Sequence, residues 1–262
     1  MPEIDKMYLE AQKALEQEEY ELAISYLQRC LEFSPHFVKA REKLAEIYYL
    51  KGDYSLAIDF IMEIYDKGIK FSNMLHLILG RCYFKLSKYK EAFSEYKFVL
   101  ADAINLSYVD YCNLGYVYNK IGNSQESLQY YHRAYQLNSN GKTALFNLGL
   151  SYFKMGDYSR SYDFFEKSYQ FMEDNTDINN KLGVLSIVLK KDEHEAEKFF
   201  KKALSKNNNY LPAMYNYIKI INYFTKDYVL LDEYMMLFRK FCMDREKVHE
   251  LEKLITYDDR QY

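Results

Sequence analysis

A short motif that recurs every 34 or 35 residues constrains this chain more than any other feature. The motif is Leu-Gly-x2-Tyr, and it begins at Leu44 (with Ala in the glycine place), Leu79, Leu114, Leu148 and Leu182 (with Ser in the tyrosine place). A fixed period of this length indicates that one supersecondary unit is repeated along the chain. The structure of that unit therefore decides the fold.

The unit is predicted to be a helical hairpin. Around Leu148, apolar residues and a glycine recur at helical spacing, and a second amphipathic pattern from Tyr158 to Ser168 follows a break at Gly156. Gly149 lies on the apolar face of the first helix, where a glycine costs about 1 kcal/mol relative to alanine. We therefore expect the second helix to approach the backbone at Gly149. A single hairpin cannot bury both apolar faces, so neighbouring hairpins must stack on it.

The second helices repeat as well, with a small residue followed four places later by a large apolar one. The small residues are Ala23, Ala57, Ala92, Ser127, Ser161 and Ala196. Together with Leu-Gly-x2-Tyr, this pattern resembles the tetratricopeptide repeat family over nearly the whole chain. The resemblance implies an all-α, right-handed superhelical solenoid.

The resemblance divides the chain into about seven repeats within one domain, 1–262. Their expected bounds are 4–37, 38–72, 73–107, 108–141, 142–175, 176–210 and 211–243. A further helix at about 244–257 carries Val248, Leu251, Leu254 and Ile255 on one stripe. We expect it to cap the exposed end of the solenoid, and dimerisation through this helix is the alternative.

Several classes of function find no support in the sequence. Lys+Arg 35 against Asp+Glu 38 gives a net charge of −3, so we expect no nucleic-acid partner. The sequence has no run of 18 apolar residues, so it predicts no membrane span. It also contains no phosphate-binding glycine loop and no His/Cys metal cluster. We therefore expect no cofactor, no metal and no catalytic residue. Four scattered cysteines favour free thiols and a cytoplasmic protein.

Each first helix carries a second stripe, about 200° from the one that packs on its own hairpin. In the family this face lines a concave groove where partners dock. Leu77, Phe84, Cys112, Phe146 and Phe153 are apolar residues on this stripe, and they either contact a partner or pack sideways on the next first helix.

The polar residues of this stripe recur at fixed places. Asparagines precede the repeat leucine or its equivalent, and lysines end the first helices. An asparagine amide can both donate to and accept from an extended backbone, and lysines near a helix C-terminus also suit the helix dipole. The residues expected to bind a partner are Arg81, Phe84, Lys85, Asn113, Tyr116, Asn119, Lys120, Asn147, Phe153, Lys154, Lys181 and Asn216.

The charge of this face predicts the type of partner. Over repeats three to seven the stripe carries six cations, with Lys219 among them, against Asp177 alone. The leading hypothesis is a protein-interaction scaffold that binds an extended, acidic peptide. The second is a structural subunit that assembles, as a homo-oligomer or otherwise, through its end helices or convex face. RNA binding is a third, weaker hypothesis, which would require strongly salt-dependent binding.

Overall fold

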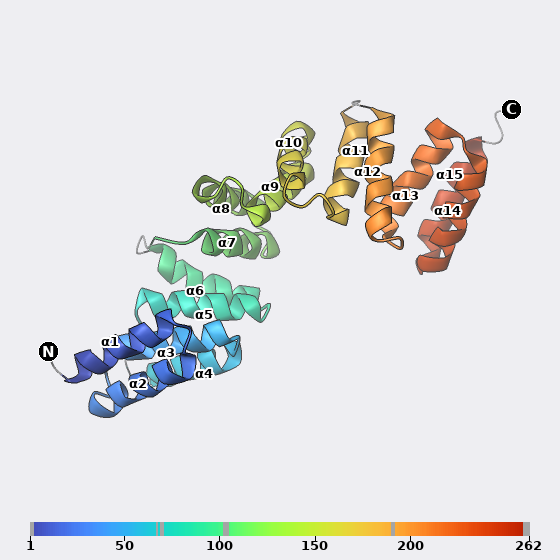
Figure 1. The fold of residues 1–262 in the computed structure, drawn as a ribbon. Coiled ribbons are helices and arrows are strands. Elements are labelled where there is room, and N and C mark those ends of the chain that lie inside the picture. Colours follow the sequence, from blue (N-terminus) through green and yellow to red (C-terminus); the bar gives the residue numbers. More distant parts are fainter. Residues whose placement is uncertain (1–2, 67, 69–70, 102–104, 190–191, 259–262) are drawn as a thin grey trace. The chain divides into compact units, whose positions relative to one another are not determined.

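The computed structural model describes residues 3–66, 68, 71–101, 105–189 and 192–258, and all regular secondary structure in these residues is helical (Figure 1). The helices form the seven expected hairpins and one further helix. The hairpins are α1 (Glu3–Glu16) with α2 (Tyr20–Phe33), α3 (Val38–Lys51) with α4 (Tyr54–Asp66), α5 (Asn73–Lys85) with α6 (Tyr89–Ala101), α7 (Tyr108–Lys120) with α8 (Ser124–Leu137), α9 (Lys142–Lys154) with α10 (Tyr158–Tyr169), α11 (Thr176–Val188) with α12 (Glu193–Lys206), and α13 (Leu211–Ile220) with α14 (Tyr228–Phe241); α15 (Arg245–Asp258) follows. The all-α repeat fold is therefore confirmed.

The chain divides into two compact units, Met1–Arg133 and Ala134–Tyr262, whose boundary falls within α8. We call them unit 1 and unit 2. The single domain inferred from the repeats stays a prediction.

Each regular hairpin is closed by a ring that covers the glycine of the first helix. A Cβ added to Gly149 would lie 3.0 Å from the ring of Phe165, and one added to Gly115 would lie 2.6 Å from the ring of Tyr131. Ser161 and Ser127, the small residues of the second helices, donate hydrogen bonds of 2.9 and 2.6 Å to the carbonyls of these two glycines. The glycine, the small residue and the ring therefore recur together, because all three meet where the two helices of a hairpin cross.

The turn between the helices of a hairpin requires a left-handed residue. Gly52, Gly122 and Gly156 supply it with φ of +84°, +88° and +76°. In the first and third hairpins Glu18 and Ser87 stand at this place, with φ of +60° and +59°. Side chains at these angles cost roughly 1–2 kcal/mol, so these two turns are strained relative to the others.

First helices also pack on one another within a unit. Leu77 of α5 is buried with Leu114 and Val117 of α7, while Phe146 and Phe153 of α9 pack on the core around Leu182 of α11. For these apolar residues the sideways packing left open by the sequence is what the structure shows. The two phenylalanines remain only half-buried.

The last hairpin of unit 2 departs from the pattern. A π-helix, η1 (Ile221–Thr225), extends α13, and Lys226 closes it in the left-handed conformation. Beyond α14, Leu251 of α15 is fully buried, and its stripe neighbours pack on the core formed by α13 and α14. The apolar stripe of α15 is therefore occupied within this unit.

All four cysteines are free and buried: Cys30, Cys82, Cys112 and Cys242. Over the described residues, no helix is both long and apolar enough to cross a bilayer.

Candidate functional site

The expected binding residues fall on two sets of first helices. In unit 1 they lie on α5 and α7, and in unit 2 on α9, α11 and α13. The two sets differ in how much of their charge is already paired within the protein.

In unit 1, Arg81 is bound by Asp110, a carboxylate of α7 that is not among the residues of the first-helix stripe. Its Nε and a terminal guanidinium nitrogen donate to the two oxygens of Asp110 at 2.7 Å each, which joins α5 to α7. Burial raises the pKa of Asp110, but hydrogen bonds from Arg81 and Ser107 outweigh it, so the pKa is lowered. Arg81 therefore stabilises the packing of unit 1 and contributes little free charge to its face. The signal was present in the Ser-x-x-Asp capping box that begins α7.

An aromatic cluster in unit 1 surrounds Lys120. The ring of Phe84 packs edge-on against Tyr89 and Tyr116, with centroids 6.0 and 5.7 Å away. The Lys120 ammonium lies 5.2 Å from the Tyr116 centroid and 5.9 Å from that of Tyr89. Hydrogen bonds with Ser87 and Tyr116, and the charge of Lys120, lower the pKa of Tyr89. Tyr89 begins a second helix, so the first-helix stripe did not reveal it.

Lys85 is exposed near this cluster and Asn119 is half-buried beside Lys120. Neither lysine has an ion pair among the described residues. The cationic part of this face therefore consists of Lys85 and Lys120.

The three recurrent asparagines lie in different surroundings. Asn113 is buried, and its amide nitrogen makes no hydrogen bond of normal geometry to the described residues. Asn147 donates to the Thr143 carbonyl of its own helix at 2.8 Å. Asn216 donates to the side-chain oxygen of Asn180 at 2.9 Å and so joins α13 to α11. Among the described residues, the second N–H and the oxygen of Asn147 and of Asn216 make no side-chain hydrogen bond and can bind other partners.

In unit 2, Lys154 and Lys181 lie on neighbouring first helices, α9 and α11. Lys181 of α11 is half-buried, with its ammonium 4.3 Å from the ring centroid of Phe153 on α9. Burial is the main cause that lowers the pKa of Lys181; Asp177 partly opposes it, and the charge of Lys154 adds to it. Asp177 itself accepts a hydrogen bond from the hydroxyl of Tyr210. The local charge is therefore positive and only partly compensated.

The lysine face of unit 2 is defined here as Asn147, Phe153, Lys154, Lys181, Asn216 and Lys219. Asn147, Lys181 and Asn216 stand at equivalent places of α9, α11 and α13, directly before the repeat leucine or its equivalent. Phe153, Lys154 and Lys219 lie on the same first helices, and Lys154 is exposed. The arrangement suits a carboxylate that lies over Lys154 and Lys181.

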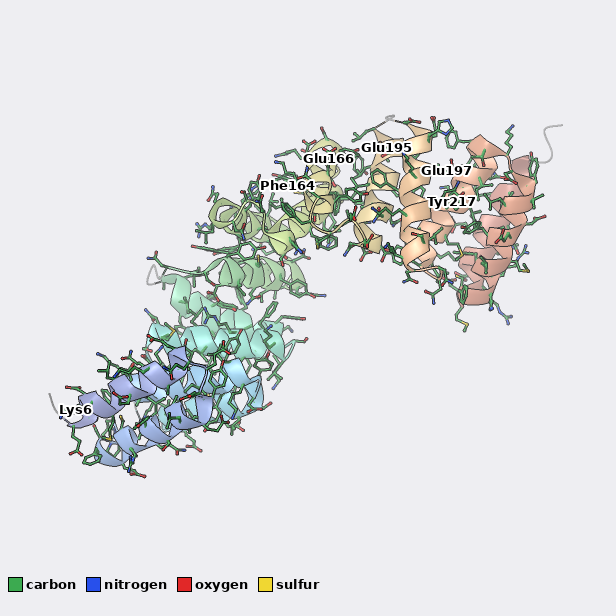
Figure 2. All side chains as sticks on the ribbon, viewed as in Figure 1. Lys6, Phe164, Glu166, Glu195, Glu197 and Tyr217 are labelled. Atoms are coloured by element: carbon green, nitrogen blue, oxygen red, sulfur yellow. The ribbon has the colours of Figure 1, made fainter. Side chains whose placement is uncertain are left out.

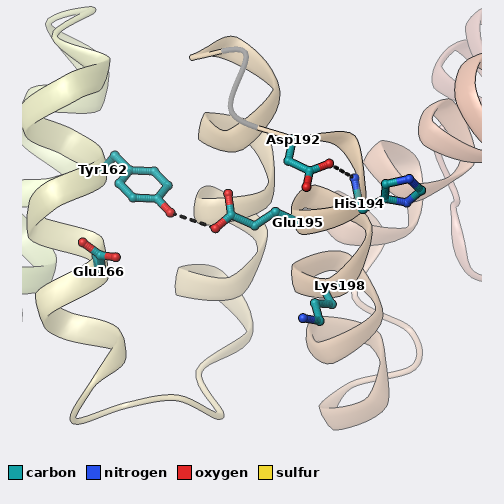
Figure 3. Close-up of a pocket in the computed structure, with 6 residues that line it drawn as sticks. All are labelled: Tyr162, Glu166, Asp192, His194, Glu195 and Lys198. Carbon is teal, nitrogen blue, oxygen red and sulfur yellow. Dashed lines mark hydrogen bonds between the residues drawn. The ribbon is translucent and has the colours of Figure 1, made fainter.

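A different hollow, of about 570 Å³, lies between α10 and α12 of the same unit (Figure 3). Two of its lining residues, Glu166 and Glu195, are labelled in Figure 2. Its lining includes the carboxylates of Glu166, Asp192 and Glu195. Glu195 accepts hydrogen bonds from Tyr162 at 3.2 Å and from Ser186 at 2.8 Å. Burial and the Glu195 charge raise the pKa of Tyr162 to about 12. This hollow belongs to the second helices, and its three carboxylates against Lys198 give it a charge opposite to that of the lysine face.

In the part of the chain that the structure describes, no three His, Cys, Asp or Glu side chains are grouped so as to hold a metal ion.

Comparison with known proteins supports the repeat assignment in two stretches. Residues 16–99 match the family model of anaphase-promoting complex (cyclosome) subunit 3, and residues 105–174 match a tetratricopeptide repeat model. No curated protein matches the chain at a significant level.

Solved structures match over most of the chain. YrrB, described as a tetratricopeptide protein with an unusual peptide-binding site, is 19% identical with a TM-score of 0.62 and covers 72% of this chain and 96% of its own. Pseudomonas aeruginosa pilF is 18% identical with a TM-score of 0.64, covering 82% of this chain and 96% of that one. The C-terminal part of a repeat protein from Cytophaga hutchinsonii is 17% identical with a TM-score of 0.61, covering 93% and 98%.

Structural similarity at such low sequence identity shows that the fold is shared and does not extend to function. The repeated hairpins, their glycine–ring crossings and the two matched stretches agree with one another. The chain belongs to the tetratricopeptide repeat family, whose members generally mediate protein–protein interaction.

Proposed function

We propose that this protein is a non-catalytic interaction module that binds an acidic, extended segment of a partner protein on the first-helix faces, chiefly on the lysine face of unit 2. The observation that carries the proposal is the state of Lys181. Its ammonium is half-buried against Phe153, and its pKa is lowered by burial and by Lys154. The negative charge of a bound carboxylate would oppose this lowering, because it favours the charged form of both neighbouring lysines.

The remaining groups of this face suit an extended backbone. Asn147 and Asn216 retain amide groups that can donate to and accept from a peptide. In unit 1, Lys85 and Lys120 offer a second place for acidic side chains, with the aromatic cluster beside them. Arg81 is left out of the proposed contacts, since Asp110 already binds it.

The expected size of the charge contribution follows from exposure. Exposed ion pairs contribute about 0.2–1 kcal/mol each. Lys154 is exposed, and its reversal to glutamate removes one such pair and adds a repulsion of similar size. Lys154→Glu should therefore weaken the binding of an acidic peptide by about two- to thirtyfold, at about 1.4 kcal/mol for each factor of ten.

A selection experiment tests the proposal directly. Random dodecapeptides displayed on phage are selected on the full chain, and we expect the enriched peptides to be rich in Asp and Glu. Lys154→Glu and Lys120→Glu are tested separately, and each should reduce the acidic bias contributed by its own unit. The matched controls are Lys240→Glu on α14 and Lys90→Glu on α6, which change the same charge at exposed sites outside the first helices. Enrichment without acidic bias on the wild-type chain would refute the proposal.

Self-assembly through the C-terminal helices is a second candidate, favoured by a specific surface of α14. Val229 and Met236, seven residues apart and so on one helical face, are 83% and 64% exposed. By contrast, the large rings of Phe200 on α12 and Phe238 on α14 are buried in the core of unit 2 and are not open to such a contact. Light scattering of Val229→Lys/Met236→Lys decides this point: an oligomer that dissociates in the variant supports assembly, and a wild-type monomer excludes it.

A further inference from the structure

An apolar hollow of about 280 Å³ lies between α11 and the α13–η1 segment of unit 2. Its walls are Val184, Ile187 and Val188 from α11, and Ile220, Tyr223 and Phe224 from the other side. Ligand pockets for whole small molecules span roughly 300–1,000 Å³, so this one is suited to a single large side chain.

The rim of the hollow exposes apolar surface that the fold itself does not cover. Val188, Tyr223 and Phe224 are 45%, 44% and 49% exposed. A contiguous apolar patch bordered by polar groups commonly marks an interaction site. The π-helix contributes directly, because both exposed rings belong to η1. Such segments occur frequently at functional sites.

Phe200 of α12 and two polar residues complete the lining, and neither polar residue is acidic. Lys219 is half-buried, with its ammonium 5.6 Å from the Tyr215 ring centroid, and it makes no ion pair with a described residue. Asn216 is held in place by its hydrogen bond to Asn180, which leaves one N–H and the amide oxygen. The hollow thus combines an apolar floor, one cation and one oriented amide.

We propose that this hollow binds one aromatic or leucine-sized side chain of a partner segment, with a carboxylate of the same or the adjacent residue against Lys219. The inference rests on the proposed function, because it supposes that the partner lies along the first helices of unit 2. It adds a specificity determinant: an acidic segment without a large apolar residue at this place binds less tightly.

Derivatives of single amino acids can test separately the two parts of this site, the apolar hollow and the Lys219 ammonium. The probes are N-acetylphenylalanine, which has a ring and a carboxylate, its amide, which has the ring alone, and N-acetylaspartate, which has no ring. Each is titrated into the full chain with labelled Ile, Leu and Val methyl groups, followed by NMR. We expect N-acetylphenylalanine to shift the methyl signals of Val184, Ile187, Val188 and Ile220. The amide should bind about two- to fivefold more weakly, as an exposed ion pair would give, and N-acetylaspartate should leave these signals unchanged.

Variants assign the effect to the hollow. Lys219→Ala should make the acid and the amide bind equally, whereas Lys240→Ala, a control on α14 outside the lining, should preserve their difference. Val188→Trp, at an exposed position, should fill the hollow and reduce binding of both ring-bearing probes at least tenfold. Unchanged binding in Val188→Trp, or shifts that do not cluster at these methyl groups, would overturn the inference.

The outcome is separable from that of the proposed function. If these methyl signals move on dilution of the protein without any probe, a second copy of the chain occupies the hollow, and the inference fails. If the hollow binds no probe while Lys154→Glu still reduces the acidic bias of the selected peptides, the inference fails alone. If the probes bind as expected but phage selection shows no acidic bias, the broader proposal fails and the hollow remains an apolar side-chain site.

Discussion

Substitution of Gly115 by alanine tests the glycine–ring crossing of the repeats. In a helix, alanine is favoured over glycine by about 1 kcal/mol, so propensity alone predicts stabilisation. The structure predicts the opposite, because the new Cβ would lie 2.6, 2.7 and 2.9 Å from three ring atoms of Tyr131. Tyr131 is fully buried and cannot move into solvent. Overpacking of this kind costs typically 1–3 kcal/mol, so we expect Gly115→Ala to destabilise α7 and α8 by about 1–2 kcal/mol.

Gly80 provides the matched control in the same unit. A Cβ at Gly80 would lie 3.1–3.3 Å from the ring of Tyr96, a contact that needs only a small shift. There the gain in helix propensity should offset the strain, and we expect Gly80→Ala to change the local stability by less than about 1 kcal/mol.

Amide hydrogen exchange measured by mass spectrometry is the appropriate assay. Repeat arrays unfold locally, since each repeat contacts mainly its neighbours. A loss of about 1–2 kcal/mol should accelerate exchange of α7 and α8 amides by about five- to thirtyfold, whereas α1 and α2 serve as an internal reference. Equal or greater protection in Gly115→Ala than in the wild-type chain would refute this account of the crossing.

Three further predictions follow from the turns, the buried ion pair and the thiols. Ser87→Gly should stabilise unit 1 by about 0.5–1 kcal/mol, because its φ of +59° strains a side chain but not glycine; a lower midpoint in urea would contradict this. Asp110→Asn should cost about 3 kcal/mol, since it leaves Arg81 largely buried without its partner. The pKa of Asp110 is lowered on folding. Its contribution to the free energy of unfolding is therefore complete above the unfolded pKa of about 3.9 and is lost as the pH falls through the folded pKa. Below about pH 4 the wild-type chain should lose more stability than the variant, as urea titrations at pH 7 and 3 would show. Burial raises the pKa of Cys82 to about 12 and that of Cys112 to about 11, so native protein at pH 8 should resist iodoacetamide at both sites, and their alkylation without denaturant would show that these helices open.

The sequence by itself determined the helical hairpins and their order. Leu-Gly-x2-Tyr and the small residue 12 places after the glycine meet within one hairpin, as Gly149, Ser161 and Phe165 do in the structure. The residues of each such contact lie close together in the sequence. Because the contact recurs in successive repeats, the sequence pattern predicts it. The sequence also identified the first-helix stripe and most of its lysines and asparagines.

Only the tertiary structure decided which of those side chains already contact a partner within the protein. Arg81 and Asp110 are 29 residues apart, and Lys181 and Phe153 are 28 apart, so each pair forms only when adjacent first helices stack in register. The hollow beside Lys219 depends on a π-helical segment that no repeat of the motif encodes. The sequence of a stripe gives its residue types and charges. Which charges pair, which side chains are buried and where a cavity forms depend on how two helices are rotated against each other, and packing across the whole unit sets that rotation.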